Sequence, residues 1–99
     1  MTRRLNLLPA AEADLSDIWD YTAARWSLNQ ARIYASGITD LLSLLCDQPE
    51  VAQHNGNTVP PVRVHRYQSH IVIFTADDSL LEVIRVVHAR SNWQALLAE

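Results

Sequence analysis

Residues 62–87, VRVHRYQSHIVIFTADDSLLEVIRVV, decide the fold of this 99-residue chain. They contain three runs rich in β-branched residues, at 62–67, 69–76 and 80–87. Short polar connections at 68–69 and 77–79 separate the runs, and connections of this length join antiparallel neighbours. The middle run holds Ile71-Val72-Ile73-Phe74, apolar at every position, which indicates a central strand buried on both faces. The stretch therefore predicts three adjacent antiparallel strands.

Two helices are predicted on the N-terminal side of these strands. Residues 10–26 repeat apolar side chains at three- and four-residue steps, and Pro9 suits the first turn because its missing N–H needs no helical partner. A second helix begins after Ser27, where Ser27-Leu28-Asn29-Gln30 matches a capping box, and ends at Pro49. Gly37 weakens this helix by about 1 kcal/mol relative to alanine. The tight connection between the helices predicts a helical hairpin.

Shorter elements complete the pattern. Residues 3–8 are predicted to form a strand, residues 51–61 a polar loop, and residues 92–98 a short helical segment capped by Ser91. The predicted order is β-α-α-β-β-β with a C-terminal helix. This is an α+β fold in which a helical hairpin packs on a small, mainly antiparallel sheet. The length predicts a single domain over residues 1–99.

Composition excludes several classes of function. The net charge of −3 argues against a general nucleic-acid binder, and no direct sequence-specific binding of nucleic acid is expected. No apolar run reaches the roughly 18 residues that a membrane span needs, so we expect a cytoplasmic protein without membrane contact. Cys46 is the only cysteine, and the four histidines lack metal-ligand spacing, so no metal site is expected. Two glycines cannot form a phosphate-binding loop, and no cofactor is expected.

The charges are unevenly distributed along the chain. Residues 9–50 contain seven acids and two arginines, and the first helix carries Glu12, Asp14, Asp17 and Asp20, which are expected to form a solvated face. Residues 51–99 contain four acids, four arginines and all four histidines. All eight basic residues of the chain are arginines, whose planar guanidinium binds carboxylates and phosphates in a two-pronged geometry.

Several residues of the second half are candidates for binding an anion. On an antiparallel sheet they could meet on the face that the helices leave open, and there grip a phosphodiester or an acidic peptide. The alternative is scattered surface arginines that form local salt bridges with Asp77, Asp78 or Glu82. The candidates are Arg63, Arg66, Arg85, His88, Arg90 and Trp93.

The first helix also resembles that of a known family. Residues 9–22 contain the pattern Pro-x-Ala-x-x-Asp-Leu-x-x-Ile-x-x-Tyr-Thr, which recurs in ParE toxins of the RelE/ParE superfamily. Residues 69–74 are similar to the central strand of that family, and residues 82–93 to its last strand and tail. The resemblance spans nearly the whole chain, and the predicted order of elements agrees with it.

The resemblance implies the toxin of a type II toxin–antitoxin system. ParE toxins act on DNA gyrase, block DNA replication and are neutralised by a ParD-like antitoxin. RelE toxins share the fold but cut mRNA on the ribosome, which requires groups that exchange protons and cations that hold the phosphate. This chain has no lysine, and Trp93 at the tail cannot exchange protons. The resemblance therefore favours a gyrase inhibitor without catalytic chemistry of its own, with a RelE-like ribosome-dependent mRNA endoribonuclease as the alternative.

Target binding, antitoxin binding and RNA cleavage would each depend on a different set of residues. Target binding would use Arg63, Arg66, Arg85, Arg90 and Trp93. Antitoxin binding would use Trp19, Trp26, Leu44 and Arg85, although the two tryptophans, seven residues apart on the first helix, could instead pack against the second helix. The nuclease alternative would use Arg63 or Arg66 as the phosphate clamp, with His88 and Arg90 as acid and cation.

Overall fold

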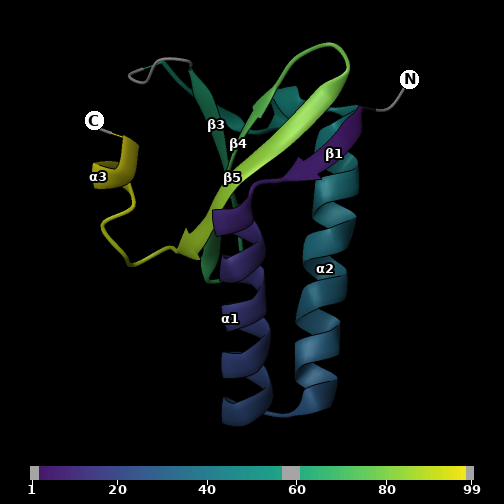
Figure 1. Cartoon of the computed structure of the whole chain (residues 1–99), viewed down its shortest axis with the longest axis vertical. Coiled ribbons are helices and arrows are strands. Elements are labelled where there is room, and N and C mark those ends of the chain that lie inside the picture. Colours follow the sequence, from purple (N-terminus) through teal and green to yellow (C-terminus); the bar gives the residue numbers. More distant parts are fainter. Residues whose placement is uncertain (1–2, 57–60, 98–99) are drawn as a thin grey trace.

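The computed structural model describes residues 3–56 and 61–97. Two long helices, α1 (Pro9–Arg25) and α2 (Leu28–Asp47), form a hairpin beside a five-stranded sheet (Figure 1). The predicted α+β class, with a helical hairpin on a mainly antiparallel sheet, is confirmed. The remaining elements are β1 (Arg4–Leu7), the 3-10 turn η1 (Pro49–Val51), β2 (Gln53–Asn55), β3 (Val62–Tyr67), β4 (His70–Ala76), β5 (Leu80–His88) and α3 (Gln94–Leu97).

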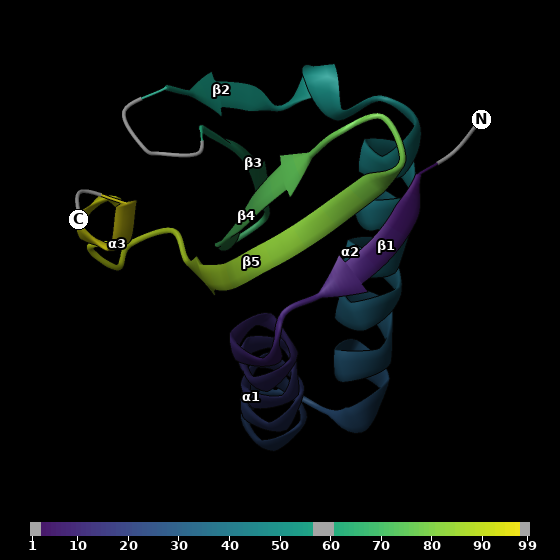
Figure 2. The ribbon, with the colours of Figure 1, turned by 45° about the horizontal axis from the view of Figure 1, so that its top comes forward.

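The strand order is β1-β5-β4-β3-β2, so β1 and β2 lie at the two edges (Figure 2). β1 pairs with β5 in parallel, from Arg4 opposite Leu80 to Leu7 opposite Val83. The other three pairings are antiparallel. Pairing of β4 with β5 shifts between Ile73 and Phe74, because a bulge inserts one extra residue into β5.

The prediction of a loop over residues 51–61 is wrong in part. Its Gln53–Asn55 segment is an edge strand, with His54 opposite Arg63 of β3, while residues 57–60 lie outside the described part of the chain. Gln-His-Asn has low intrinsic β-propensity, so tertiary pairing with β3 overrides the local preference here.

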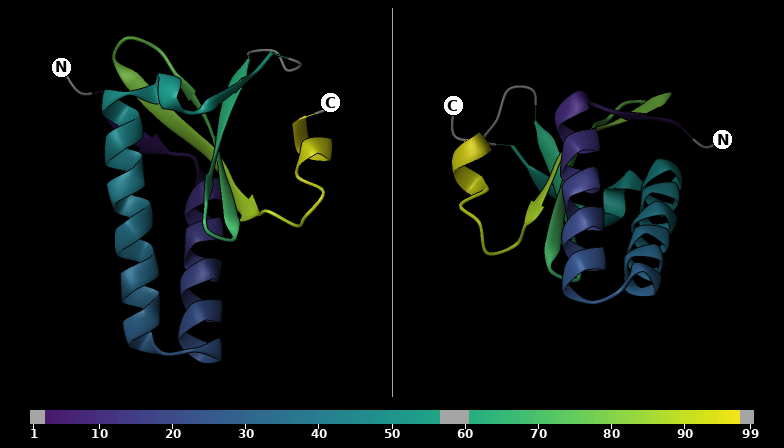
Figure 3. Two further views of the ribbon diagram at one scale, coloured as in Figure 1. Left: turned by 180° about the vertical axis from the view of Figure 1, so that it is seen from behind. Right: turned by 60° about the horizontal axis from the view of Figure 1, so that its bottom comes forward.

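Apolar side chains pack on both faces of the sheet. One cluster, which includes Leu45, Phe74 and Leu81, lies between the sheet and the helical hairpin. A second cluster lies on the opposite face, and the tail turns back to pack Trp93 and Leu97 against it (Figure 3). We call these surfaces the helix face and the far face. The far-face cluster is built on Val62, Val64, Ile71 and Ile73.

The predicted helix caps are formed only in part. The Ser27 hydroxyl accepts a hydrogen bond from the Gln30 N–H at 2.9 Å, as the capping box requires. The Ser27 N–H, however, donates to the Thr22 carbonyl at 3.3 Å rather than to the Gln30 side chain. Ser91 does not cap α3, because its hydroxyl donates to the His88 carbonyl at 2.6 Å and α3 begins three residues later. The predicted end of this segment at Ala98 lies outside the described residues.

The turn end of the hairpin projects beyond the sheet, as front and rear views agree (Figures 1 and 3). Side chains near this end therefore lack the cover that the sheet gives to the other half. Tyr21 and Trp26 are each 67% exposed. Within the described ranges, no helix combines the length and the apolar character needed to cross a bilayer.

Candidate functional site

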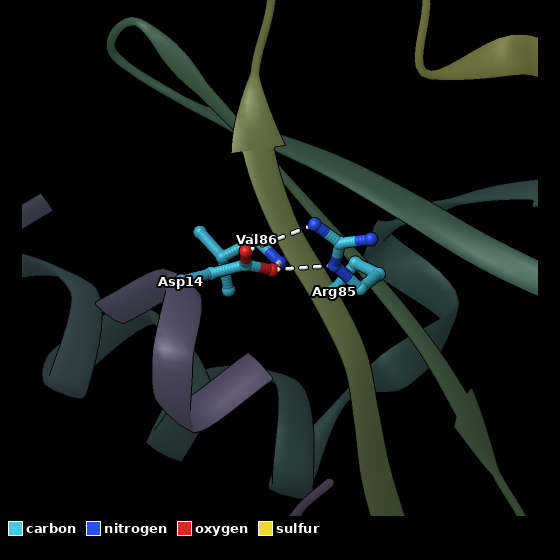
Figure 4. Close-up of polar contacts among 3 residues, drawn as sticks. All are labelled: Asp14, Arg85 and Val86. Atoms are coloured by element: carbon cyan, nitrogen blue, oxygen red, sulfur yellow. Dashed lines mark hydrogen bonds and ion pairs between the residues drawn. The ribbon is translucent and has the colours of Figure 1, made fainter. Parts of the chain in front are cut away.

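Asp14 joins α1 to β5 through three hydrogen bonds (Figure 4). Its carboxylate accepts from Arg85 Nε at 2.7 Å and Nη2 at 3.0 Å, and from the Val86 backbone N–H at 2.9 Å. The hydrogen bonds to Asp14 raise the pKa of Arg85. Arg85 is therefore already neutralised, and the expectation that all four acids of the first helix form a solvated face is wrong for Asp14.

The shape of the sheet explains this contact. β1 covers the edge of β5 as far as Val83, where the chain leaves for α1 and the Leu8 N–H donates to the Val83 carbonyl at 3.0 Å. Beyond that point the edge of β5 needs another partner for its backbone. The bulge at Ile84 turns Arg85 and the Val86 N–H toward α1, so one carboxylate satisfies both.

Three ring side chains meet at the end of the sheet that faces the helical hairpin. They belong to Tyr34 of α2, His70 of β4 and His88 of β5. His70 and His88 are cross-strand partners whose ring centroids are 5.4 Å apart. The Tyr34 hydroxyl of α2 lies 2.7 Å from His70 Nδ1 and accepts from the Ser69 N–H at 3.3 Å. Burial raises the pKa of Tyr34, whereas burial and the neighbouring His88 lower the pKa of His70. Both groups are therefore neutral at pH 7.

A hydrogen bond also fixes the orientation of the His88 ring. The Arg90 backbone N–H donates to His88 Nδ1 at 3.0 Å. This bond holds the His88 ring in the turn that leads to the tail, with Nδ1 as the acceptor.

These rings line a groove of about 920 Å³ between the projecting hairpin and the end of the sheet. We call it the hairpin groove. A smaller hollow shares Asp17, Ile18, His70 and His88 with it and extends along α1 toward the tail. The hairpin groove is lined by Asp17, Ile18, Tyr21, Thr22, Trp26, Ser27, Gln30, Tyr34, Ser69, His70 and His88.

The structure does not gather the candidate arginines on one face. Arg63 lies opposite Phe74, on the helix face, and donates to the Ala52 carbonyl at 3.1 Å. Arg66 lies opposite Ile71, on the far face. Residues three apart on a strand point to opposite faces, so the expectation that both would meet on the open face is wrong for Arg63. The alternative partners Asp77, Asp78 and Glu82 are not used either: among the described residues, the ion pair of the molecule joins Arg85 to Asp14.

Two of the candidates lie on the far face. Arg66 is in register with Ile71 and Val87 across β3, β4 and β5, and Trp93 packs against the cluster that includes Ile71 and Val87. Arg90 lies in the exposed turn between β5 and α3. Within the described ranges, neither Arg66 nor Arg90 has a carboxylate partner.

The antitoxin candidates lie on separate surfaces. Trp19 lines an apolar groove between α1 and α2, together with Leu5 of β1 and Ala35 of α2. Trp26 lines the hairpin groove instead, and Leu44 is 44% exposed on α2. Arg85 is bound to Asp14. The two tryptophans, which are seven residues apart in the sequence, therefore line different grooves.

Sequence reasoning missed Asp14, Tyr34 and His70 as organising residues. Asp14 lies within the family motif, and that position was the available signal. Nothing local connects Tyr34 to His70, because their contact depends on how α2 packs over β4. Among the described residues, no three His, Cys, Asp or Glu side chains gather in a way that could hold a metal ion.

Comparison with known proteins identifies the family of this chain. Residues 5–93 match the family model described as the ParE toxin of the type II toxin–antitoxin system parDE. This chain belongs to the ParE toxin family. A curated relative in Caulobacter vibrioides, Toxin ParE1, is 33% identical over 87 residues, covering 88% of this chain and 90% of the relative.

A further relative and a solved structure agree with this placement. Toxin ParE1 of Mycobacterium tuberculosis is 30% identical over 93 residues, covering 93% of this toxin and 95% of that protein. A solved chain described as the chromosomal ParDE system from P. aeruginosa superposes with a TM-score of 0.71 at 19% identity, covering 88% of this toxin and 96% of that chain. At that identity the superposition establishes the shared fold, and the sequence matches establish the family.

Proposed function

We propose that this ParE-family toxin inhibits DNA gyrase and so blocks replication in the cytoplasm, and that a ParD-like antitoxin neutralises it. Family membership supports the toxin–antitoxin role. The observation that carries the mode of action is the position of Arg66 and Trp93 on the far face, together with the exposed Arg90 in the turn before the tail. Arg66 donates to the Gln68 carbonyl at 2.7 Å, and among the described residues neither guanidinium group has a carboxylate partner. Exposed arginines and a partly exposed indole are typical of surfaces that bind another macromolecule.

The nuclease alternative has weaker support. It requires Arg63 or Arg66 to hold a phosphate beside His88 and Arg90. Arg63 lies four residues along β3 from the row that contains His70 and His88, which is about 13 Å at 3.3 Å per residue. Arg66 lies on the opposite face from His88. Proton transfer and phosphate binding need these groups within hydrogen-bond reach of one reacting site.

The antitoxin is expected to occupy the apolar groove between α1 and α2. Leu5 and Trp19 line this groove next to the free edge of β1, and Arg3 and Arg4 lie at the start of that strand. An extended segment can add to an exposed strand edge while its apolar side chains fill a neighbouring groove. The two arginines favour a segment that carries acidic residues.

A supercoiling assay tests the proposal. Purified toxin, relaxed plasmid, gyrase and ATP should give linear, cleaved DNA in place of supercoiled product, and the ParD-like antitoxin should restore supercoiling. The Arg66→Ala/Arg90→Ala double variant should lose at least about tenfold in potency, since two interface arginines are removed. Arg32→Ala, an exposed charge removal on α2, is the matched control and should retain potency.

The antitoxin arm uses the same assay. Trp19→Ala should require more antitoxin for rescue, whereas Trp26→Ala should not. Full supercoiling at high toxin excess rejects gyrase as the target. Cleavage of mRNA in a translation extract by the same preparation would support the nuclease alternative.

A further inference from the structure

The hairpin groove has a distinct chemical character. Asp17 is the charged residue among those that line it, and its side chain makes no hydrogen bond or ion pair with the described residues. Its neighbours three and four positions away on α1 are Ala13, Asp14, Asp20 and Tyr21, so no cation on the helix compensates it. With His70 neutral, the Asp17 carboxylate gives the lining of the groove a negative charge at pH 7.

Aromatic faces form the walls of the groove. Tyr21 and Trp26 are each 67% exposed, although the ring of each would gain free energy from burial. The Arg25 guanidinium lies 5.0 Å from the centre of the Trp26 ring, so the chain's own arginine already packs on one face of this indole. Gln30 and Ser27 add uncharged polar atoms at the rim.

Phosphate and carboxylate ligands fit this environment poorly. They would meet the uncompensated Asp17 carboxylate, and Arg85 in the adjoining hollow is already bound to Asp14. A cation gains from the carboxylate and from the aromatic faces together. Arginine fits better than lysine, because its planar guanidinium can bind a carboxylate and stack on a ring at the same time.

We infer that the hairpin groove binds an arginine side chain of a protein partner, with Asp17 as the counter-charge and Tyr21 and Trp26 as the aromatic walls. A volume of about 920 Å³ exceeds that of one side chain, so the arginine is presented by a short peptide segment that also carries apolar residues. The hairpin groove shares Ile18, Thr22 and Tyr34 with the apolar groove between α1 and α2, but Asp17, Tyr21 and Trp26 belong neither to that groove nor to the far-face cluster. The inference does not depend on gyrase as the target.

NMR of the full-length, ¹⁵N-labelled toxin tests the inference with two matched probes. One is the tripeptide acetyl-Leu-Arg-Leu-amide, and the other replaces arginine by citrulline, its uncharged isostere. The arginine peptide should shift the indole N–H signal of Trp26, assigned with Trp26→Phe, and bind more tightly than the citrulline peptide. Added salt should weaken the arginine peptide selectively.

Two charge variants locate the counter-charge. Asp17→Asn should lower the affinity for the arginine peptide by up to about fivefold, the upper end of the effect of an exposed ion pair. Asp47→Asn removes the same charge at the far end of α2, outside the groove, and should change the affinity by less than about twofold.

Three outcomes would overturn the inference. They are equal binding of the two peptides, an equal loss in both charge variants, and shifts confined to the Trp19 or Trp93 indole signals. The comparison of peptides uses the unaltered toxin, so it remains decisive even if a variant folds poorly. Because neither gyrase nor antitoxin is present, a negative result leaves the supercoiling assay unaffected.

Discussion

At the scale of single residues, Asp14 has a structural role that its neighbours in the sequence do not indicate. On a helix it is one of several acids, yet it satisfies a bulged strand and an arginine from a segment 71 residues away. Its side chain is 14% exposed, so solvent competes only weakly for these bonds. Arg85 consequently stabilises the fold and is not free to bind a partner.

Replacing Asp14 tests this role. Asp14→Ala leaves the Val86 N–H and the Arg85 guanidinium without their partner and should lower the free energy of unfolding by about 2 kcal/mol. Chemical denaturation followed by circular dichroism measures the change. Asp20→Ala makes the same substitution at an exposed position of α1 and should cost less than about 0.5 kcal/mol. Equal losses in the two variants would contradict the assignment.

At the scale of elements, α2 has its weakest intrinsic helix former where the Tyr67 side chain of β3 packs against it. A Cβ atom at position 37 would lie 1.7 Å from the Tyr67 hydroxyl oxygen and 2.6 Å from its Cζ. The Tyr67 ring packs edge-on against Tyr34 with centroids 5.1 Å apart, which limits its movement. Glycine at position 37 therefore lowers the helix propensity of α2 but leaves room for the Tyr67 ring of β3.

Because of this contact, we expect Gly37→Ala to change the stability in opposite directions when Tyr67 is present and when it is removed. Gly37→Ala alone should destabilise the toxin by about 1–2 kcal/mol, because overpacking outweighs the gain in helix propensity. In a Tyr67→Ala background the same change should stabilise by up to about 1 kcal/mol, because the clash is gone. Thermal unfolding of the four proteins in the cycle measures the coupling. Stabilisation by Gly37→Ala in both backgrounds would show that Tyr67 does not constrain this position.

At the scale of the whole molecule, the sheet carries apolar side chains on both faces, and different segments cover them. The helical hairpin covers one face and the C-terminal tail the other. The tail has a single four-residue helix, so its position depends on Trp93 and Leu97 rather than on its own helical stability. It thereby brings Trp93 to the side of the sheet that carries Arg66.

Removal of one tail side chain tests this packing. Trp93→Ala should lower the free energy of unfolding by about 2 kcal/mol, since a partly buried indole leaves the far-face cluster. Leu96→Ala, in α3 but 50% exposed and outside that cluster, should cost less than about 0.5 kcal/mol. Hydrogen exchange should show lost protection at Ile71 and Val87 in the first variant alone. Equal protection in both variants would mean that the tail does not stabilise the sheet.

Some of the molecule was determined by the sequence alone. Apolar periodicity, Pro9, the Ser27 cap and the short polar turns specify the helices and β3–β5, because these signals act between residues close in the chain. The motif in residues 9–22 indicates the family in the same way, since all of its positions lie on one helix. These features need no knowledge of what packs against them.

The tertiary structure alone decided the rest. The edge strand β2, the Asp14–Arg85 pair and the meeting of Tyr34 with His70 all depend on strand register, a bulge and helix placement. A shift of one residue in register moves a side chain to the other face of a sheet, and no local pattern records such a shift. Which charges remain free to bind a partner is therefore a property of the assembled fold.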